Sequence, residues 1–479
     1  MVGILAFAGI VAALTQTLVV PLIAQLPTLF DTSASNASWV ITATLLAAAV
    51  STPVAGRLGD MYGKRRMLLV SLVPLVLGSV VCALSSSVVP MITGRGLQGL
   101  GMGVVPLGIS LLRDVVPAKK LGPSIAIMSA SMGVGGALGL PFAAAIAENT
   151  SWRVLFWVVA VLAIAVGALI LALVPADRPA TTTTTTSFDL PGAIGLGAAL
   201  IALLLAVSKG ADWGWGSATT LTLFAAVLVL LPAWGWWELR LRDPLVDLRV
   251  TARPQVLMTN TASILVGFAM YAQSLVVPQL LQLPEATGYG LGQSMLAMGL
   301  WMAPAGLMMM AMSPVGAKLS AAKGPKVTLA VGSLLIAAGY GLSVPLIGSG
   351  SPWSLLIVTL VCNSGVGFAY GAMPALIMSA VPQSETASAN SFNALMRSIG
   401  TSFAAAVIGV VLARMTTDFG GFPLASENGF RVAMLIGCGV GLAAAVVAAL
   451  IPVRTTKAPL QPTETSGSTT PETAPATKA

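Results

Sequence analysis

Apolar residues run through this chain in long blocks that are separated by short polar segments. A helix of about 20 mostly apolar residues is long enough to cross the hydrocarbon core of a bilayer. The pattern predicts an all-α polytopic membrane protein with about fourteen transmembrane helices. The predicted spans lie near residues 2–28, 36–58, 67–86, 88–112, 122–146, 154–174, 190–208, 218–237, 255–282, 291–313, 327–347, 352–378, 392–413 and 430–452.

Lysine and arginine are distributed unevenly over the predicted loops. The loops after even-numbered spans hold Lys64, Arg65, Arg66, Lys119, Lys120, Arg178, Arg240, Arg242, Arg249, Lys323 and Lys326. The opposite loops carry few cations: Arg153, Lys209, Arg414 and Arg431. Because cytoplasmic loops are enriched in Lys and Arg, and an even number of spans brings both ends of the chain to one side, we expect both termini in the cytoplasm. The abundance of Gly and Ala favours a bacterial inner (plasma) membrane.

The composition indicates a protein surrounded by lipid, and it limits which side chains can bind metals or protons. Hydrophobic residues make up 56% of the chain and charged residues 8%, whereas soluble domains carry about 25% charged residues. The net charge of +8 does not predict a nucleic-acid partner, because the cations sit in short loops between apolar blocks. The chain has no histidine, and its cysteines lack metal-site or disulfide spacing. We therefore expect no metal or cofactor, and any proton chemistry must fall to carboxylates.

An internal repeat divides the chain into two halves. Residues 53–65 and 314–326 share a proline, a valine, a cation, a leucine, a glycine and a closing cation, without a gap, at an offset of 261 residues (314 − 53). We predict a six-helix bundle at 1–175, a linker with two extra transmembrane helices at 176–253, a second six-helix bundle at 254–453 and a disordered cytoplasmic tail at 454–479. The threonine tract at 181–186 belongs to the linker. Duplicated halves are typical of alternating-access transporters.

The first copy of the repeat contains Gly56-Arg57-Leu58-Gly59-Asp60-Met61-Tyr62-Gly63-Lys64-Arg65-Arg66. This segment resembles the loop signature of the major facilitator superfamily, and the chain from residue 1 to about 452 is similar to its fourteen-span drug:proton antiporters. The resemblance implies a cytoplasmic gating latch formed by Gly56, Arg57, Gly59, Asp60, Gly63, Lys64 and Arg66. We expect Gly59 and Gly63 to turn the backbone tightly and Asp60 to pair with a cation such as Arg66 or Arg113. A plain basic hairpin is the alternative.

Two further segments resemble signatures of the same family. Residues 95–101 in span four, which begin with Arg95, imply a role for this arginine in proton transfer; the alternative is an arginine that snorkels to the outer interface. Residues 133–141 in span five resemble the antiporter signature, which implies a bendable helix containing Gly135, Gly139 and Pro141. The match is partial because Leu140 separates Gly139 from Pro141. Packing of small residues between helices is the alternative for this segment.

The coupling acid of the drug:proton antiporters is missing from the first span. Thr15 stands where that branch carries an aspartate, and no Asp or Glu lies deep within a predicted span. We expect the proton on a peripheral carboxylate, Glu148 or Asp60, with Asp114 as a further carboxylate on the inner side. The membrane-embedded cations Arg95 and Arg397 would suit a neutral, anionic or zwitterionic substrate with acidic or carbonyl groups.

Polar or aromatic residues inside apolar spans are candidates for a substrate cavity. They are Thr15, Gln16, Tyr271, Gln273, Trp301, Asn363 and Asn393. We predict a monomeric secondary transporter that exports small drug-like molecules or antibiotics in exchange for protons. A nutrient importer or facilitator, and a membrane sensor that does not transport, are the alternatives. No nucleophile–base pattern indicates an enzyme, and no G-x-x-x-x-G-K-[ST] segment indicates ATP drive.

Overall fold

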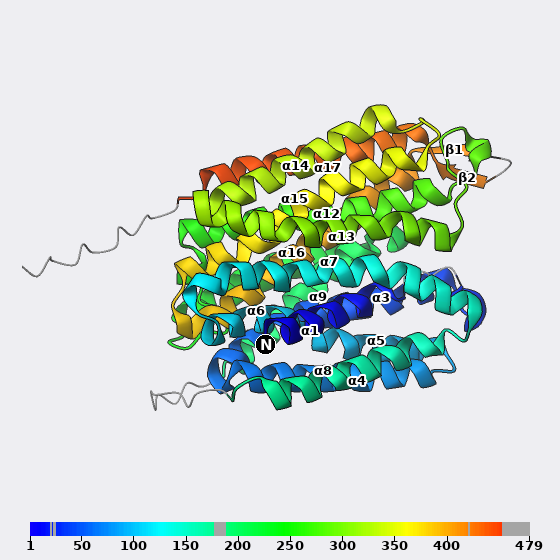
Figure 1. Ribbon diagram of the computed structural model, residues 1–479. Helices are drawn as coiled ribbons and strands as arrows, with labels where there is room; N and C mark the ends of the chain where they lie inside the picture. The colour runs from blue at the N-terminus through cyan, green and yellow to red at the C-terminus, as the bar shows by residue number, and fades with distance from the viewer. Residues whose placement is uncertain (20–21, 23–24, 177–187, 420–421, 453–479) are drawn as a thin grey trace, which may run out of the picture.

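The computed structural model describes residues 1–19, 22, 25–176, 188–419 and 422–452. Its long helices lie roughly parallel to one another in two groups (Figure 1). The linker tract at 181–186 and the tail at 454–479 lie outside the described residues.

The first group contains seven longer helices and one short one. They are α1 (Val2–Thr17), α2 (Leu26–Leu29), α3 (Ala34–Tyr62), α4 (Lys64–Leu84), α5 (Val88–Leu100), α6 (Val104–Val115), α7 (Ala118–Asn149) and α8 (Arg153–Leu173). The second group contains α12 (Pro254–Gln282), α13 (Met295–Lys323), α14 (Pro325–Leu346), α15 (Pro352–Ala380), α16 (Thr386–Arg414) and α17 (Glu427–Leu450). Between the groups in sequence come α9 (Leu190–Trp213), α10 (Ala218–Arg240) and the short α11 (Leu248–Thr251).

Twelve helices in the described part of the chain are long and apolar enough to cross a membrane. Two predicted spans differ from single long helices. The span at 2–28 is an apolar helix only as far as Thr17. The span at 88–112 is divided by the 3₁₀ turn η2 (Gly101–Gly103) between α5 and α6. Glycine is a poor helix former, and a Cβ on Gly101 would lie 2.8 Å from the Ser71 carbonyl oxygen of α4, so this turn lets α4 approach closely.

The two copies of the sequence repeat fold alike. Helices α3 and α13 both have 29 residues and contain Pro53 and Pro314, respectively. Each ends before a glycine with positive φ, Gly63 at 99° and Gly324 at 87°, after which the next helix begins at once. Only glycine adopts such a backbone at no steric cost. The duplicated sequence therefore encodes a duplicated helix–glycine–helix unit.

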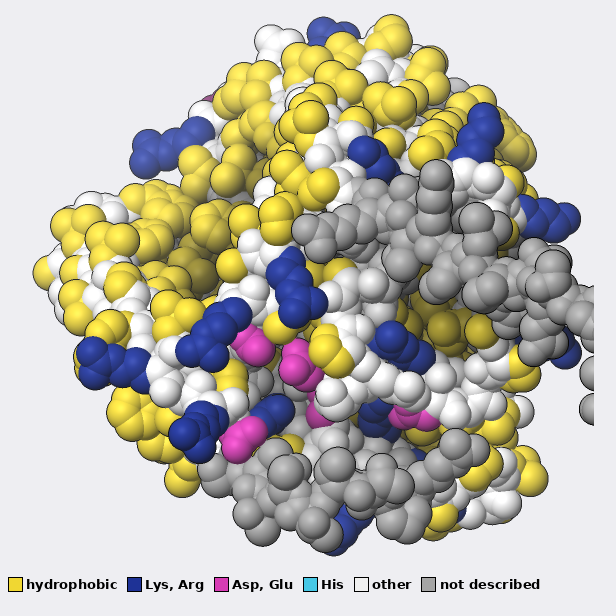
Figure 2. Space-filling model, turned by 90° about the vertical axis from the view of Figure 1, so that its left-hand side faces the viewer, with side chains coloured by type: hydrophobic (Ala, Val, Ile, Leu, Met, Phe, Trp, Pro, Cys, Tyr) yellow, Lys and Arg dark blue, Asp and Glu magenta, His cyan; other side chains and the backbone are white. Residues whose placement is uncertain are grey.

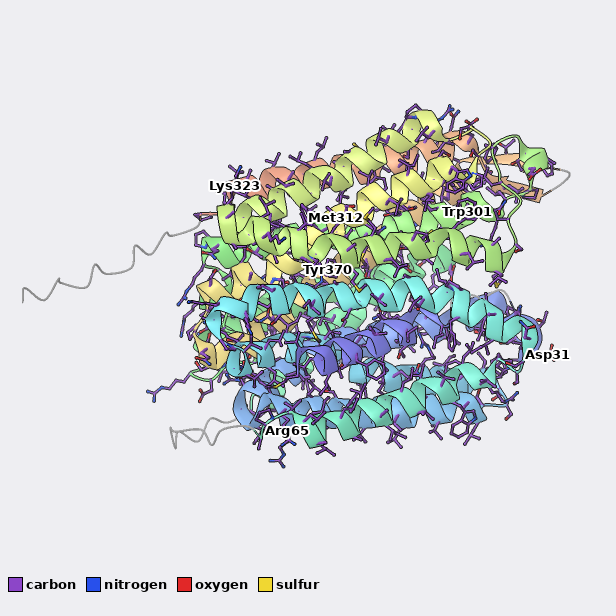
Figure 3. All side chains as sticks on the ribbon, viewed as in Figure 1. Asp31, Arg65, Trp301, Met312, Lys323 and Tyr370 are labelled. Atoms are coloured by element: carbon purple, nitrogen blue, oxygen red, sulfur yellow. The ribbon has the colours of Figure 1, made fainter. Side chains whose placement is uncertain are left out.

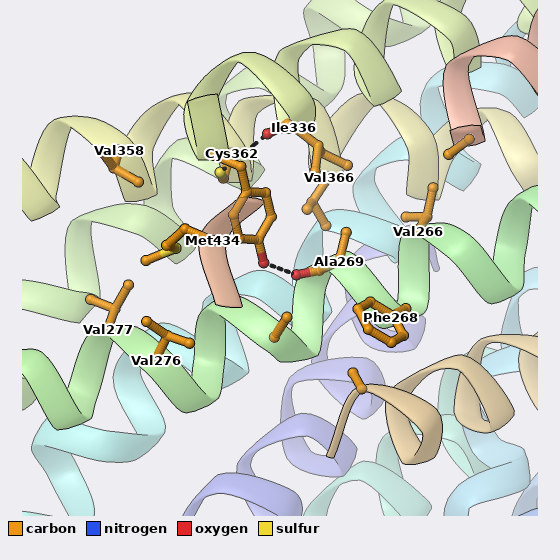
Figure 4. Close-up of a cluster of buried hydrophobic side chains, with 14 of the residues drawn as sticks. Val266, Phe268, Ala269, Val276, Val277, Ile336, Val358, Cys362, Val366 and Met434 are labelled. Carbon is orange, nitrogen blue, oxygen red and sulfur yellow. Dashed lines mark hydrogen bonds between the residues drawn. The ribbon is translucent and has the colours of Figure 1, made fainter. Parts of the chain in front are cut away.

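The two groups of helices meet along two lines of contact. Helix α7 packs along α13, and the two lie side by side across the middle of the molecule (Figure 1). Helix α3 packs along α16, and α9 covers this second line of contact by packing on both α3 and α16. Inside the second group, the Tyr340 hydroxyl donates to the Ala269 carbonyl oxygen among buried aliphatic side chains (Figure 4).

The two ends of the molecule differ in chemistry. Arg65 and Lys323 lie at one end and Asp31 and Trp301 at the other (Figure 3). We call the first of these the basic end, and Lys and Arg side chains surround a few Asp and Glu side chains on its face (Figure 2). The opposite end carries an antiparallel hairpin, β1 (Thr416–Phe419) and β2 (Phe422–Ala425), between α16 and α17. The apolar pattern did not predict these four-residue strands, which are too short to show an alternation.

Candidate functional site

The carboxylate of Asp60 joins the two helical groups at the basic end. It accepts hydrogen bonds from the backbone N–H groups of Ala387 (3.0 Å) and Ser388 (2.8 Å) and from the Ser388 hydroxyl (2.7 Å). These donors belong to the first turn of α16. The N-terminus of a helix has unpaired N–H groups and a partial positive charge, so it binds a carboxylate well. We call this contact the latch.

Two expectations for the latch segment are corrected by this geometry. The hydrogen bonds of Asp60 come from a helix end rather than from the side chains of Arg66 or Arg113; Arg113 donates instead to the Thr386 hydroxyl (2.8 Å). The segment is also not a loop, because residues 56–62 are the last turns of α3 and the backbone leaves the helix only at Gly63. Gly59 is helical, and its missing side chain makes room for Leu107.

The rest of the latch segment surrounds Asp60 with further polar contacts. Lys64 forms an ion pair with Asp114 at 2.7 Å, and Asp114 also accepts from Gln383 at 2.9 Å. Arg57 approaches Asp243 at 3.7 Å. Gly56 lets α3 lie against α16, because a Cβ there would be 2.6 Å from the Cβ of Ser391. Arg66 is exposed at the start of α4.

Arg95 is a buried cation in the first helical group, with only 2% of its surface exposed. Its Nη1 donates to the Thr15 carbonyl oxygen (2.8 Å) and to Gln98 Oε1 (2.7 Å), and its Nε donates to the Val40 carbonyl oxygen (3.3 Å). Gln98 in turn donates to the Ser79 hydroxyl (2.8 Å). The alternative of an arginine that snorkels is therefore wrong. Thr15 contributes its backbone oxygen, from the last turn of α1, where the helix dipole favours a cation.

Arg397 is a second buried cation, in the second helical group. Its Nη1 donates to Asn393 Oδ1 (2.9 Å), and its guanidinium carbon lies 4.8 Å from the ring centre of Tyr370. Asn393 donates to Asn260 Oδ1 (2.9 Å) and to the Ser263 hydroxyl (2.7 Å). Tyr370 lies near mid-length of the molecule, where the two groups meet (Figure 3). The sequence reasoning missed Tyr370 and Asn260, although a polar residue inside an apolar block was an available signal for both.

In the described part of the chain, no carboxylate lies within ion-pair distance of either buried arginine. Ion pairs there join other side chains, among them Arg57–Asp243, Lys64–Asp114, Lys209–Asp212 and Arg431–Glu427. Asp60 of α3 is half-buried and Glu238 of α10 is buried, and both lie close to a helix end. The interior at mid-length is thus positive. The side chain of Glu148, the other expected proton carrier, lies outside the described residues.

The remaining cavity candidates are spread over separate places. Gln16 is exposed on α1 and donates to Met102 Sδ at 3.5 Å. Gln273 is buried and accepts from Asn363 at 3.5 Å. Tyr271 is half-buried. Trp301 packs edge-on against Trp353, with ring centres 4.9 Å apart, at the end opposite the latch.

The glycines of the antiporter-type segment let α7 pack tightly on both of its sides. Gly135 and Gly139 face α1, where added Cβ atoms would meet Ala13 and Thr17. On its other side, α7 faces α13 with Gly133 and Pro141. Two glycines of α13 allow this contact: a Cβ added to Gly306 would collide with Ala137 of α7, and a Cβ added to Gly299 would lie 3.0 Å from the nitrogen of Pro141. Residues four apart share a helix face, so Gly135 and Gly139 both contact α1. Helix α7 is continuous through Pro141.

Comparison with known proteins gives the family. Residues 5–405 match the Major Facilitator Superfamily. The chain is 30% identical over 415 residues to an uncharacterized MFS-type transporter of Mycobacterium tuberculosis, covering 85% of this chain but only 58% of that relative's length. It is 28% identical to the multidrug resistance protein Stp of M. tuberculosis (80% of this chain, 70% of Stp) and 28% identical to the tetracenomycin C resistance and export protein of Streptomyces glaucescens (81% and 70%).

Solved structures agree on the fold. The human organic anion transporter TETRAN superposes with a TM-score of 0.65 at 14% identity, covering 93% of this chain and 98% of that one. The proton:xylose symporter XylE superposes with a TM-score of 0.62 at 14% identity, covering 94% and 95%. The solved structures share this all-α fold, and the match over residues 5–405 identifies the chain as a member of the major facilitator superfamily of multi-pass membrane proteins.

Proposed function

We propose that this transporter exports small drug-like molecules by alternating access, in exchange for protons. The latch carries the proposal. A carboxylate on α3 that binds the N-terminus of α16 is a reversible connection, because it consists of three hydrogen bonds between two helical groups with largely separate cores. Breaking it would open a path from the basic end. The named activities of the two relatives, multidrug resistance and tetracenomycin C export, support the outward direction.

The proposed topology has fourteen spans. In addition to the twelve long helices, α1 serves as the first span, and α5, η2 and α6 together serve as the fourth. The domains are then the bundles at 1–175 and 254–453, joined by the segment at 176–253. The cations of the basic end (Figure 2) support a cytoplasmic location for that end and for both termini, following the charge rule for membrane loops. The transporter would function as a monomer in a bacterial inner membrane.

The proposed substrates are neutral, anionic or zwitterionic. Two buried arginines without carboxylate partners make the interior positive. A buried cation of this kind is costly, so it is usually retained for a function. Arg397, on the face of α16 that meets Tyr370, would bind an acidic or carbonyl group, and the Tyr370 ring would stack on an aromatic portion of the substrate. A permanently cationic substrate would meet repulsion here.

A susceptibility panel tests the proposed function. The chain would be expressed in a bacterial host that lacks its own efflux pumps, and growth would be measured with antibiotics of different charge, tetracenomycin C included. We expect resistance to rise several-fold for some neutral or anionic compounds, and an uncoupler to restore their accumulation. Unchanged resistance across the panel, or increased uptake of a nutrient analogue, would contradict export.

Replacing Arg397 with glutamine should separate substrates by charge. The variant loses the cation but keeps a polar side chain that can reach Asn393. We expect transport of the anionic compounds to fall by about tenfold, which corresponds to about 1.4 kcal/mol of lost charge interaction. Transport of the neutral compounds should fall less. Inverted membrane vesicles give the initial rates. Arg431→Gln, which removes the half-exposed partner of Glu427, is the control. Equal losses for anionic and neutral compounds would argue against a substrate contact.

A further inference from the structure

Helices α9 and α10 bring two carboxylates together inside the protein at the basic end. Asp189 immediately precedes α9, and Glu238 lies in the last turn of α10. Asp189 is 7% exposed and Glu238 is 1% exposed. Neither belongs to the latch or to the two arginine networks, and a buried carboxylate without a cation is unfavourable. This pair therefore needs an explanation of its own.

Each carboxylate has one oxygen with a donor and one without. Asp189 Oδ1 accepts from the Gly192 N–H (2.9 Å) and from the Trp237 indole (3.2 Å), and Glu238 Oε2 accepts from the Val246 N–H (3.4 Å). Asp189 Oδ2 and Glu238 Oε1 are buried without a hydrogen-bond partner. The Leu245 backbone N–H and the Trp234 indole N–H also face Glu238, and the Trp234 nitrogen is buried without a hydrogen-bond partner.

The two unpaired oxygens converge on one point. A Cβ atom added to Gly192 would collide with Asp189 Oδ2 and would lie 2.7 Å from Glu238 Oε1. Both oxygens therefore stand over the same glycine, in the space that any other residue would fill. This arrangement gives a physical reason for the spacing Asp189-Leu190-Pro191-Gly192: the aspartate caps the helix on the glycine N–H, and the glycine leaves room for the second acid.

Within the described residues, no cation reaches the pair. The neighbouring segment 241–253 carries charges of both signs, and they have other contacts: Asp243 approaches Arg57, Asp247 caps α11, and Arg249 donates to the Leu239 carbonyl oxygen. On α10 itself, Arg240 stacks on Trp236 at 3.7 Å. Arg253 donates to the Ala380 carbonyl oxygen, and the remaining charges near the segment, Arg242 and Glu385, line the neighbouring pocket described below. Two adjacent buried carboxylates repel each other strongly when both are ionised.

We propose that Asp189 and Glu238 together bind one proton, held between Asp189 Oδ2 and Glu238 Oε1, and that this pair is a proton site of the transport cycle. The proton converts two unpaired acceptors into a donor and an acceptor, which satisfies both atoms. The transport role rests on the proton antiport proposed above. The binding of the proton does not depend on it.

The backbone connects this acid pair to the latch. Val246, whose N–H binds Glu238, lines a cavity of about 100 Å³ together with Arg57, Asn260 and Ser388. Ser388 is the latch partner of Asp60, and Asn260 binds Asn393 beside Arg397. Helix α9 also packs on both α3 and α16. Separation of α3 from α16 would therefore move the wall of the cavity, admit water to the acid pair and release the proton at the basic end.

Infrared spectroscopy of the purified full-length transporter tests the proton directly. We expect the wild type to show the carbonyl band of a protonated carboxylic acid at neutral pH, to shift this band in D₂O and to lose it at high pH. Asp189→Asn and Glu238→Gln should each lose the band. Glu427→Gln, which changes a half-exposed carboxylate already paired with Arg431, should keep it. Gel filtration of each variant shows whether it has folded.

The same measurement distinguishes a proton from a metal cation. If the wild type lacks the band at neutral pH, or if both variants keep it, the proposal is wrong. If sodium or potassium removes the band at constant pH, the pair is a cation site and the proposal is likewise wrong. In vesicles, Glu238→Gln should flatten the dependence of transport on the pH at the basic side. A wild type that shows the band but does not respond to a pH gradient would contradict the antiport and leave proton binding intact.

Discussion

Replacing Asp60 with asparagine is expected to reduce transport by about 100-fold while leaving the protein folded. The carboxylate accepts three hydrogen bonds from the first turn of α16. Hydrogen bonds to a charged group contribute about 1.5–3 kcal/mol each, and the negative charge at a helix N-terminus adds up to about 2 kcal/mol. Asparagine keeps one acceptor oxygen, so we take the loss as about 3 kcal/mol, or about 100-fold in the equilibrium of the latch.

The measurement is the initial rate of pH-driven transport in proteoliposomes, with a compound that the susceptibility panel has identified. Asp31→Asn is the matched control, because Asp31 is exposed at the opposite end and its positive φ of 47° suits asparagine equally well. Ser388→Ala should give a smaller loss, since it removes one of the three hydrogen bonds. Full transport by the Asp60 variant would show that the latch does not control the cycle.

Replacing Gly306 with leucine is expected to lower transport to the level of vesicles without protein. Gly306 is buried on α13, where even a Cβ atom would collide with Ala137 and with the Gly133 carbonyl oxygen of α7. A leucine cannot fit unless the two helical groups move apart, and overpacking of this kind costs about 1–3 kcal/mol or more. Because α7 and α13 form one of the two lines of contact between the groups, the state with these helices in contact would be lost.

Gly136→Leu provides the control on the partner helix, α7. Gly136 lies on α7 beside the contacting glycines, but an added Cβ there meets nothing within 4 Å, so this variant should transport normally. Gly306→Ala should fall between the two. Gel filtration and membrane yield exclude misfolding as the cause. Normal transport by Gly306→Leu would mean that the close contact of α7 with α13 is not part of the cycle.

Much of the fold could be predicted because lipid imposes simple rules on a sequence. Blocks of about 20 apolar residues must form helices, since no other partner satisfies their backbone in hydrocarbon. The 261-residue offset between Pro53 and Pro314 predicted two similar halves, and within the repeated segment Gly63 and Gly324 have matching positive φ angles. The asymmetry of Lys and Arg likewise predicted a basic end. Glycine-rich interruptions such as Gly101–Gly103 were missed because they leave the apolar pattern unchanged.

The candidate site was predicted as a set of residues but not as a set of contacts. Asp60, Arg95 and Arg397 stand out in the sequence because charged residues are rare in spans. Their partners could not be identified from the sequence, because Asp60 binds a residue 328 positions away and Arg95 binds a backbone oxygen 80 positions away. A cation was the natural expectation for Asp60, since side-chain charges can be read from a sequence and the charge of a helix N-terminus depends on where that helix lies.

The sequence by itself indicated the apolar helices that can cross a membrane, the repeated helix–glycine–helix segment and the charged residues that are costly to place in lipid. These follow from local composition and spacing, which do not depend on the rest of the chain. Only the tertiary structure decided that the latch closes on a helix end, that Arg397 stacks on Tyr370, and that Asp189 and Glu238 share the space over Gly192. The rotation of each helix about its axis decides such contacts. That rotation is set by packing against neighbours that are distant in sequence.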